Sequence, residues 1–243
     1  MRVISWFSCG AASAVASKLT IKKYGHNDVH IVYCDTLSSE HPDNIRFLND
    51  IKNWLNHDIE LIKSEEFNDI DEVFTKTRYM SGINGARCTI EMKKKPRYEY
   101  QNPGDIHIFG LTSDEEKRIE RFKNNNPNLK IDFILSHNNI TKNECYKILR
   151  ESGIKLPVMY SLGFNNNNCI GCVKSTSAKY WNRVRRYFPE IFNKRCQQSR
   201  DINVRLVRYR GERIFLDQLP NEETDEIEEN IECGVICIVE REG

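Results

Sequence analysis

Nine cysteines occur among the 243 residues, and four of them form two closely spaced pairs. Cys169 and Cys172 are separated by two residues in a turn rich in Asn and Gly, and Cys233 and Cys237 are separated by three. Both spacings suit thiolate ligands, and two such pairs supply the four thiolates that zinc or an iron–sulfur cluster takes. We therefore expect these four cysteines to hold Zn or a [4Fe–4S] cluster and to fasten the C-terminal tail to the rest of the protein.

A second candidate for chemistry is a loop of small residues over 8–13, with the sequence Ser-Cys-Gly-Ala-Ala-Ser. It lies between an expected strand over 2–7 and an expected helix over 14–24. Such a loop lets backbone N–H groups approach an anion, and the helix N-terminus adds roughly half a positive charge. The loop is therefore predicted to bind phosphate or sulfate, the alternative being an ordinary tight connection. It matches neither G-x-x-x-x-G-K-[ST] nor G-x-G-x-x-G, which disfavours a Walker nucleotidase and a Rossmann dehydrogenase.

Length and composition favour an enzyme of the cytoplasm. The many Asn and Lys residues are typical of an AT-rich genome, and if that genome is viral, the location would be the host cytoplasm. The formal net charge of +1 gives no global electrostatic argument for nucleic-acid binding. No apolar run approaches the roughly 20 residues that cross a bilayer, so we expect no membrane partner. In a reducing compartment the cysteines are metal ligands or reactive thiols rather than disulfides.

Apolar runs alternate with helical spacing along the first 155 residues. Strands are expected over 29–34, 59–62, 106–111 and 131–135, and helices over 42–56, 69–80, 88–95 (ending at Pro96), 113–122 and 141–152. This alternation predicts an α/β fold with a doubly wound parallel sheet. Ligands bind beyond the carboxyl ends of the strands in such sheets. Ser8, Asp35 and Thr112 each follow an expected strand end, so we expect them to converge on one crevice.

The character of the chain changes near Leu156, which predicts a nucleotide-binding domain over 1–155 and a Cys-rich C-terminal extension over 156–243, packed on the same core. The extension contains an expected basic and aromatic helix over 178–194, a hairpin-like segment over 204–216 and an acidic run over 222–229. Arginines interleaved with aromatic residues would suit single-stranded nucleic acid. We favour the alternative, in which Trp181, Val184 and Phe188 pack inward and the arginines are solvated.

The loop and several later segments, in order along most of the chain, resemble the PP-loop and phosphoadenosine phosphosulfate (PAPS) reductase family. Ser8, Gly10 and Ser13 hold positions of the PP-loop pattern S-G-G-x-D-S, with Cys9 in place of the first Gly and Ala12 in place of the Asp. The resemblance is nearest to the PAPS-reductase-like proteins of phages and mobile elements. The missing Asp weighs against ATP cleavage.

The later motifs match in part. Asp35 and Thr36 resemble the start of D-T-G, and Cys88, Lys93 and Pro96 resemble C-C-x-x-x-K-x-x-P with one cysteine kept. The segment from Gly110 through Thr112 and Glu115 to Arg118 resembles G-x-R-x-x-E-x-x-R, and residues 232–234 resemble the start of E-C-G-L-H. The family's His after the cysteine is absent, which weighs against the usual reductase form.

The resemblance implies an adenine nucleotide alpha-hydrolase-like fold and an adenine nucleotide, ATP, APS or PAPS, as ligand. It places that nucleotide on Ser8, Cys9, Gly10, Ser13, Asp35, Thr36, Gly110, Thr112, Glu115 and Arg118, and chemistry on Cys233, Lys93 and Cys88. A thiol reductant protein would be a partner. One alternative is an ATP-dependent PP-loop enzyme that adenylates or thiolates a nucleobase or other substrate, and another is an inactive nucleotide-binding or regulatory protein.

The same resemblance leaves open which cysteines bind a metal or cluster and which one acts as a nucleophile. The cysteine order of APS reductases implies a [4Fe–4S] set of Cys88, Cys169 and Cys172 with one of Cys196, Cys233 or Cys237. A third interpretation takes Cys233 as the thiolate that attacks sulfonate sulfur. Cys34 and Cys145, in an expected strand and helix, are interpreted as small buried hydrophobic residues.

Overall fold

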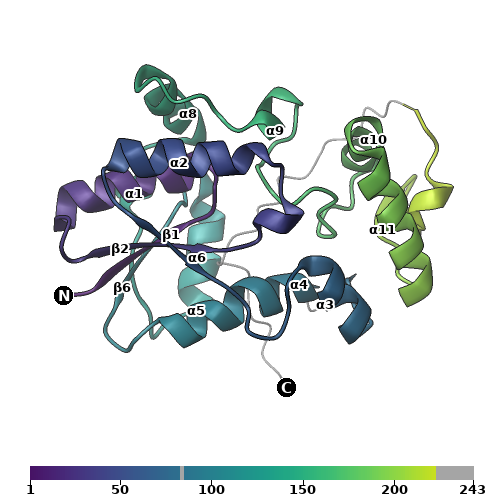
Figure 1. Cartoon of the computed structure of the whole chain (residues 1–243), viewed down its shortest axis with the longest axis horizontal. Coiled ribbons are helices and arrows are strands. Elements are labelled where there is room, and N and C mark those ends of the chain that lie inside the picture. The colour runs from purple at the N-terminus through teal and green to yellow at the C-terminus, as the bar shows by residue number, and fades with distance from the viewer. Residues whose placement is uncertain (83–84, 223–243) are drawn as a thin grey trace.

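The protein is described here by a computed structural model that covers residues 1–82 and 85–222. Its centre is a five-stranded sheet in the order β3-β2-β1-β6-β7, in which every neighbouring pair is parallel (Figure 1). The strands are β1 Val3–Phe7, β2 Val29–Cys34, β3 Ile59–Ile62, β6 Ile106–Phe109 and β7 Lys130–Asp132. The expected α/β class with a parallel sheet is confirmed.

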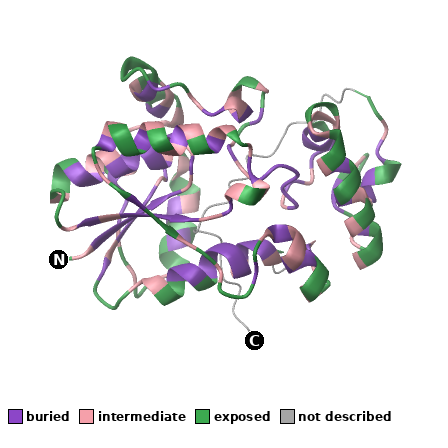
Figure 2. Cartoon of the chain, viewed as in Figure 1, coloured by how far each residue is buried: buried purple, intermediate pink, exposed green. Residues whose placement is uncertain are grey.

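Alternating residues of each strand bury both faces of the sheet. Val3 and Phe7 of β1 belong to one apolar cluster, and Ile4 and Trp6 belong to another on the opposite face. This period of two follows from strand geometry, and burial on both sides is typical of parallel sheets. The first face is covered by α1 Ala11–Tyr24, α2 Asp43–Leu55 and α8 Lys142–Glu151, and the other by α5 Lys95–Tyr100 and α6 Glu116–Asn125. Figure 2 shows the buried residues in purple along the strands between these helices.

Several boundaries near the sheet differ from the sequence-based expectation, among them the end of β6, which is Phe109 rather than residue 111. Helix α1 begins at Ala11, with Gly10 as its N-cap, so residues 11–13 form its first turn rather than a loop. The strand expected over 131–135 ends at Asp132, and Ile134–His137 forms the short helix α7. The apolar residues Ile134 and Leu135 are buried beside α1 and α8, so an apolar run that suggested a strand instead packs as one helical turn.

The helical segment is interrupted just before Pro189 but continues through Pro96. The helix expected over 178–194 is two helices, α10 Ala178–Tyr187 and α11 Pro189–Ile202. Phe188 between them has φ −139° and ψ 60°, because a residue that precedes proline is disfavoured in the helical region. Pro96 does not end its helix, since α4 Arg87–Thr89 continues through the π-helix η2 Ile90–Lys94 into α5, where Pro96 occupies the first turn and needs no N–H partner.

A third apolar cluster joins the segment 67–92 to the segment 159–219. It contains helix α3 Ile70–Thr77, α10, α11 and the antiparallel ribbon of β8 Val207–Tyr209 and β9 Glu212–Ile214. Trp181 and Val184 are fully buried and Phe188 is packed against the cluster, which confirms that these residues face inward. The expectation that the arginines are solvated holds only for Arg186, because Arg183 and Arg185 are partly buried against Phe164 and Phe192. The hairpin expected within 204–216 is also confirmed. A domain boundary at 155/156 stays a prediction.

Candidate functional site

The strand order places a topological switch point between β1 and β6. From β1 the chain adds β2 and β3 on one side, and it adds β6 and β7 on the other. The connections leave the carboxyl ends of β1 and β6 in opposite directions, and ligands of open α/β sheets bind in the crevice that this creates. Ser8 follows β1 and Gly110 follows β6, so two of the predicted nucleotide-binding residues lie at this point.

The hydroxyl of Ser13 links both ends of the turn that follows β1 through hydrogen bonds to Ser8 and Gly10. Ser13 Oγ accepts hydrogen bonds from Ser8 N and Ser8 Oγ, both at 3.1 Å, and donates to Gly10 O at 2.9 Å. Gly10 as N-cap offers no side chain, and within the described residues no side chain caps α1. The first N–H groups of an α-helix have no partner inside the helix. The turn over 10–13 therefore presents backbone donors to an anion, with the positive end of the helix dipole behind them.

Gly110 brings the end of β6 against this same turn. A Cβ atom added at Gly110 would lie 2.7 Å from Ser13 N and 2.8 Å from Ser13 Cα. Such contacts are too close for any other residue, so the two backbones meet only because residue 110 is glycine. The structure thus brings Ser8, Gly10, Ser13 and Gly110 together.

A buried polar group lies beneath the turn. Glu40 accepts a hydrogen bond from Thr36 Oγ1 and another from Asn44 Nδ2, both at 2.6 Å. Burial first, and then the charge of Glu40, raises the pKa of the Cys9 thiol well above its usual value, while Lys93 opposes the shift. Cys9 is therefore a neutral thiol at physiological pH, and its candidate contribution to a ligand is its backbone N–H.

Asp35 directly follows β2, and its side chain is 15% exposed. Its Oδ1 accepts a hydrogen bond from Leu37 N at 3.0 Å, and its Oδ2 lies 3.3 Å from Lys63 Nζ. An ionised carboxylate has about four lone-pair sites, so Asp35 retains capacity to accept a hydrogen bond from a ligand hydroxyl. Its neighbour Thr36 is buried, and the Thr36 hydroxyl is committed to Glu40.

Three of the predicted site residues after β6, Thr112, Glu115 and Arg118, are linked to one another by hydrogen bonds. Glu115 Oε2 accepts hydrogen bonds from Thr112 N and Thr112 Oγ1, both at 2.9 Å, which forms a capping box. The other oxygen of Glu115 accepts from Arg118 Nη1 at 2.5 Å. Glu115 therefore positions Arg118 and caps the helical turn, rather than offering a free carboxylate to a ligand.

The predicted catalytic residues lie in different surroundings. Lys93 in η2 is buried, and its charge lowers the pKa of both Cys9 and Cys34, so it lies near the ends of β1 and β2. Burial nevertheless raises the pKa of Cys34 to about 12. Cys88 belongs instead to the apolar cluster that contains the C-terminal helices. Cys233 and Cys237 lie outside the described residues.

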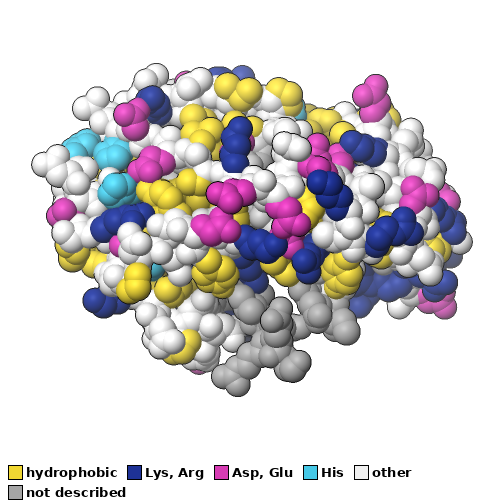
Figure 3. All heavy atoms as spheres, turned by 60° about the horizontal axis from the view of Figure 1, so that its bottom comes forward, with side chains coloured by type: hydrophobic (Ala, Val, Ile, Leu, Met, Phe, Trp, Pro, Cys, Tyr) yellow, Lys and Arg dark blue, Asp and Glu magenta, His cyan; other side chains and the backbone are white. Residues whose placement is uncertain are grey.

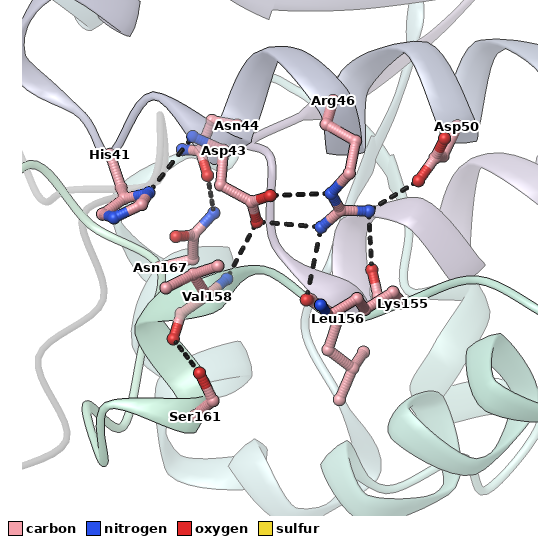
Figure 4. Close-up of polar contacts among 10 residues, drawn as sticks. All are labelled: His41, Asp43, Asn44, Arg46, Asp50, Lys155, Leu156, Val158, Ser161 and Asn167. Atoms are coloured by element: carbon pink, nitrogen blue, oxygen red, sulfur yellow. Dashed lines mark hydrogen bonds and ion pairs between the residues drawn. The ribbon is translucent and has the colours of Figure 1, made fainter.

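An anchor that the sequence did not reveal fastens the segment after residue 155 to α2 and to the site (Figure 4). Arg46 Nη1 donates to Lys155 O at 3.0 Å, and Asp43 Oδ2 accepts from Val158 N at 2.9 Å. Asn167 Nδ2 donates to Cys9 O at 2.7 Å and to Asn44 Oδ1 at 2.8 Å.

Asn167 is the residue of this anchor that lies closest to the turn. Its side chain is almost fully buried, and its Oδ1 has no hydrogen-bond donor among residues 1–82 and 85–222. Buried polar atoms normally have a partner, so this oxygen marks a place where a ligand, a water or a residue outside the described ranges completes the site.

The cysteine pair Cys169 and Cys172 lies in a buried turn. Gly171 between them has φ +67°, and the Cys172 N–H donates to Tyr180 Oη at 2.7 Å. Burial, with Cys172 and Cys169 alongside, raises the pKa of Tyr180, which places both sulfurs near that hydroxyl. Arg195 Nε donates to Gly171 O at 3.2 Å and holds the turn against α11. Within the described part of the chain, no three His, Cys, Asp or Glu side chains are grouped as a metal ion requires.

Comparison with known proteins adds no assignment to this geometry. No family model matches the chain, and no curated protein matches it. Among the helices that the structure describes, none has the length and apolar character needed to span a bilayer. The function of the chain is therefore inferred from its site.

Proposed function

We propose that the chain is an enzyme of the PAPS-reductase type that binds an adenylyl (phospho)sulfate, or a related adenine nucleotide, at the turn over 8–13. The observation that carries the proposal is the start of α1, which offers backbone donors without a side-chain cap from the described residues and meets Gly110 at the switch point of the sheet. The proposal includes a doubly wound, adenine nucleotide alpha-hydrolase-like core and a Cys-rich extension. It is compatible with the observed strand order.

Each candidate residue has a role that its surroundings support. The N–H groups over 9–13 bind phosphate or sulfate oxygens, and the carboxylate of Asp35 accepts from a ligand hydroxyl. Lys93 contributes positive charge near the ends of β1 and β2. Arg118, held by Glu115, supplies a guanidinium that suits bidentate contact with an oxyanion.

The proposed reaction needs a thiolate outside the described residues, and Cys233 is the candidate. Its sulfur would attack the sulfonate sulfur, form an S–S bond and break the S–O bond, so that AMP or adenosine 3′,5′-bisphosphate leaves with the electron pair. A dithiol reductant protein would then cleave the S–S bond, release sulfite and become a disulfide. Cys9 and Cys34 do not fit the nucleophile, because burial raises the pKa of both thiols and a thiolate is required.

We also propose that Cys169 and Cys172 bind Zn or a [4Fe–4S] cluster, completed by Cys233 and Cys237. The alternative set with Cys88 is not proposed, because no three such side chains are grouped among the described residues, which include Cys88, Cys169 and Cys172. The described residues fit half of such a site, since two buried sulfurs lie near one hydroxyl in a tight turn. When bound, the metal would supply a cross-link between the C-terminal segment and the core. The ligands would be deprotonated, so a Cys233 that binds metal would not act as a free nucleophile.

The metal proposal is tested by metal analysis and absorbance of anaerobically purified protein. Cys169→Ser is expected to lose the metal and lower the thermal midpoint, while the control Cys196→Ser is expected to keep the metal and the thermal midpoint of the parent. Cys233→Ser distinguishes the two roles considered for that residue, nucleophile and metal ligand. Loss of sulfite release with metal retained identifies the nucleophile, and loss of metal and stability together identifies a ligand. Metal-free protein of full stability would contradict the metal proposal.

The nucleotide proposal is tested by calorimetry with APS, PAPS, adenosine 3′,5′-bisphosphate and ATP in the presence of EDTA. Ala12→Glu puts a carboxylate in the first turn of α1, where an acidic residue is favourable for the helix but competes with an anionic ligand. Asn49→Glu, at an exposed position of α2, is the matched charge control.

We expect a loss of about tenfold or more for Ala12→Glu, which corresponds to roughly 1.4 kcal/mol, and little change for the control. Absence of binding at millimolar nucleotide in the parent protein would overturn the proposal. Binding without sulfite release, in the presence of a dithiol, would leave the inactive nucleotide-binding alternative.

A further inference from the structure

Cys9, in the anion-binding turn over 8–13, has a backbone conformation that its residue type disfavours. Its φ is +53°, in the left-handed region where residues other than glycine, asparagine and aspartate are uncommon. Residues in such conformations persist only when their surroundings hold them there, and they cluster at functional sites. Cys9 is also fully buried, so the groups packed around it, rather than solvent, determine the direction of its backbone.

Asn167 supplies the hydrogen bond that holds this residue. Its Nδ2 donates to Cys9 O at 2.7 Å and, through its second hydrogen, to Asn44 Oδ1 at 2.8 Å (Figure 4). A carbonyl oxygen can only accept, so only one orientation of the Asn167 amide makes the bond to Cys9 O. Among the residues that the structure describes, no other group donates to Cys9 O.

A buried network holds the Asn167 amide from behind. Asn44 Nδ2 donates to Glu40 Oε2, and Thr36 Oγ1 donates to Glu40 Oε1, both at 2.6 Å. Thr36, Glu40 and Asn44 are all buried. Side chains that are locked by packing and hydrogen bonds position a partner more precisely than mobile ones do. Asn167 therefore fixes Cys9 O relative to β2 and α2.

The peptide group between Cys9 and Gly10 transmits this restraint to the ligand side of the turn. The peptide is trans, and in a planar trans peptide the C=O and N–H bonds point in opposite directions. Cys9 O faces Asn167, so the Gly10 N–H points away from Asn167. Within the described residues this N–H has no acceptor. It is therefore available to an anion together with the first N–H groups of α1.

The turn itself does not fix the direction of this peptide. Glycine adopts φ values of either sign about equally readily, so the peptide could rotate by about half a turn without strain at Gly10. The Ser13 hydroxyl holds Ser8 N and Gly10 O, which belong to the peptides on either side. Loss of the Asn167 donor would therefore release the Gly10 N–H and leave Cys9 without the contact that keeps it in the left-handed region.

The direction of a single N–H group matters here because long-range charge contributes little attraction. The formal net charge of the chain is +1, and the face shown in Figure 3 has Lys and Arg side chains interspersed with Asp and Glu side chains. Such a mixed surface does not concentrate anions as a surface of one sign does. An anion at the turn depends mainly on the donors that touch it.

We propose that Asn167 is a positioning residue of the anion site, which it reaches from the segment after residue 155. By holding Cys9 O, it keeps the Gly10 N–H directed at the sulfate or phosphate group of the ligand. The inference rests on the proposed function, because it requires an anion at the turn. It adds that the segment containing the cysteine turn takes part in nucleotide binding through Asn167.

The test is an NMR titration of isotope-labelled protein with sodium sulfate and with adenosine 3′,5′-bisphosphate. The parent is compared with Asn167→Ala and with the control Asn165→Ala, an exposed position in the same run of asparagines. We expect Asn167→Ala to lose about three- to tenfold in affinity for both ligands, the effect of one hydrogen bond. The control is expected to bind like the parent.

A second readout separates positioning from a general loss of stability. In Asn167→Ala the Gly10 amide signal should already differ from that of the parent before ligand is added, and it should respond weakly at saturation. The amides of Ala12 and Ser13, which belong to α1, should still shift. A variant in which all amides of residues 9–13 are affected alike would show only a structural role and would overturn the inference.

The remaining outcomes distinguish this inference from the proposed function. Equal affinity and an unchanged Gly10 signal in Asn167→Ala would overturn the inference and leave the proposed function intact. A parent whose residues 9–13 do not respond to millimolar ligand would overturn both. If Asn167→Ala does not fold, the parent alone decides: the side-chain NH2 signals of Asn167 should shift together with the Gly10 amide when sulfate binds, and constant NH2 signals would overturn the inference.

Discussion

Gly110 and Ser13 touch through their backbones at the switch point of the sheet. A Cβ at residue 110 would lie 2.7 Å from Ser13 N, so the end of β6 sets the position of the first turn of α1. The same Ser13 hydroxyl closes the segment after β1 through Ser8 and Gly10. One glycine and one serine therefore determine where the backbone donors of α1 point.

Gly110→Ala is expected to displace that first turn. The added methyl group meets backbone atoms that cannot rotate away, so we expect a loss of roughly 1–3 kcal/mol in unfolding free energy and weaker nucleotide binding. Urea denaturation and calorimetry measure the two effects. Gly10→Ala is the control for stability, because its Cβ would meet its nearest neighbours at 3.6–3.7 Å and its φ is −103°. Equal stability of Gly110→Ala and the parent would contradict the close approach.

Asn167→Ala is expected to release the anchor from the site. It removes the donor that binds Cys9 O and Asn44 Oδ1 and leaves those buried acceptors with fewer partners. The expected cost is about 1–3 kcal/mol in unfolding free energy, measured by urea denaturation. Asn165→Ala, an exposed position in the same run of asparagines, should change stability by less than about 0.5 kcal/mol. If the two variants behave alike, the anchor has no energetic role.

Arg195→Met is expected to destabilise the third apolar cluster. Arg195 is 2% exposed, forms an ion pair with Asp71 of α3 and donates to Gly171 O in the cysteine turn. Breaking a buried pair by removal of one partner costs about 3 kcal/mol or more. Lys194→Met removes an exposed cation from the same Asp71 and should cost about 0–1 kcal/mol. A guanidinium chloride titration of both variants checks the difference, and similar costs would contradict it.

His107 should make stability fall in mild acid. Burial, together with the charge of Arg97, lowers the pKa of His107 to about 4, and its Nδ1 accepts from Trp6 Nε1 at 3.1 Å. Below the ordinary pKa of about 6.5 the unfolded chain binds a proton that the folded protein does not, so stability falls as the pH decreases from 6.5 toward 4. The loss from this residue is on the order of 3 kcal/mol.

His107→Gln keeps an acceptor for Trp6 and removes the titration. Urea denaturation at neutral pH and near pH 4.5 should show a smaller acid-dependent loss in the variant than in the parent. Identical pH profiles would show that His107 is not buried in its neutral form.

The central strands were predictable from the sequence because a strand that is buried on both faces appears as a short continuous run of apolar residues. The expected strands over 29–34 and 59–62 match β2 and β3, and β1 falls within the expected 2–7. The error at Pro189 has a local cause that the chain does reveal, since this proline can begin a helix as readily as end one. Pro96 depends on the preceding π-helix, whose geometry no residue pattern announces.

The candidate site was predictable only in part. Ser8, Asp35 and Gly110 follow strand ends, so their convergence follows from a parallel sheet. Asn167 could not be predicted, because its contact with Cys9 joins residues 158 positions apart and its neighbours are also asparagine.

The most direct test of the nucleotide site is an NMR titration of the backbone amides of labelled protein with adenosine 3′,5′-bisphosphate, with and without sulfate. The account predicts that the amides of residues 9–13 shift first and most strongly, together with those near Gly110, and that Ala12→Glu abolishes these shifts. A titration to millimolar ligand that leaves residues 9–13 unchanged, or that shifts only residues far from that turn, would contradict the account.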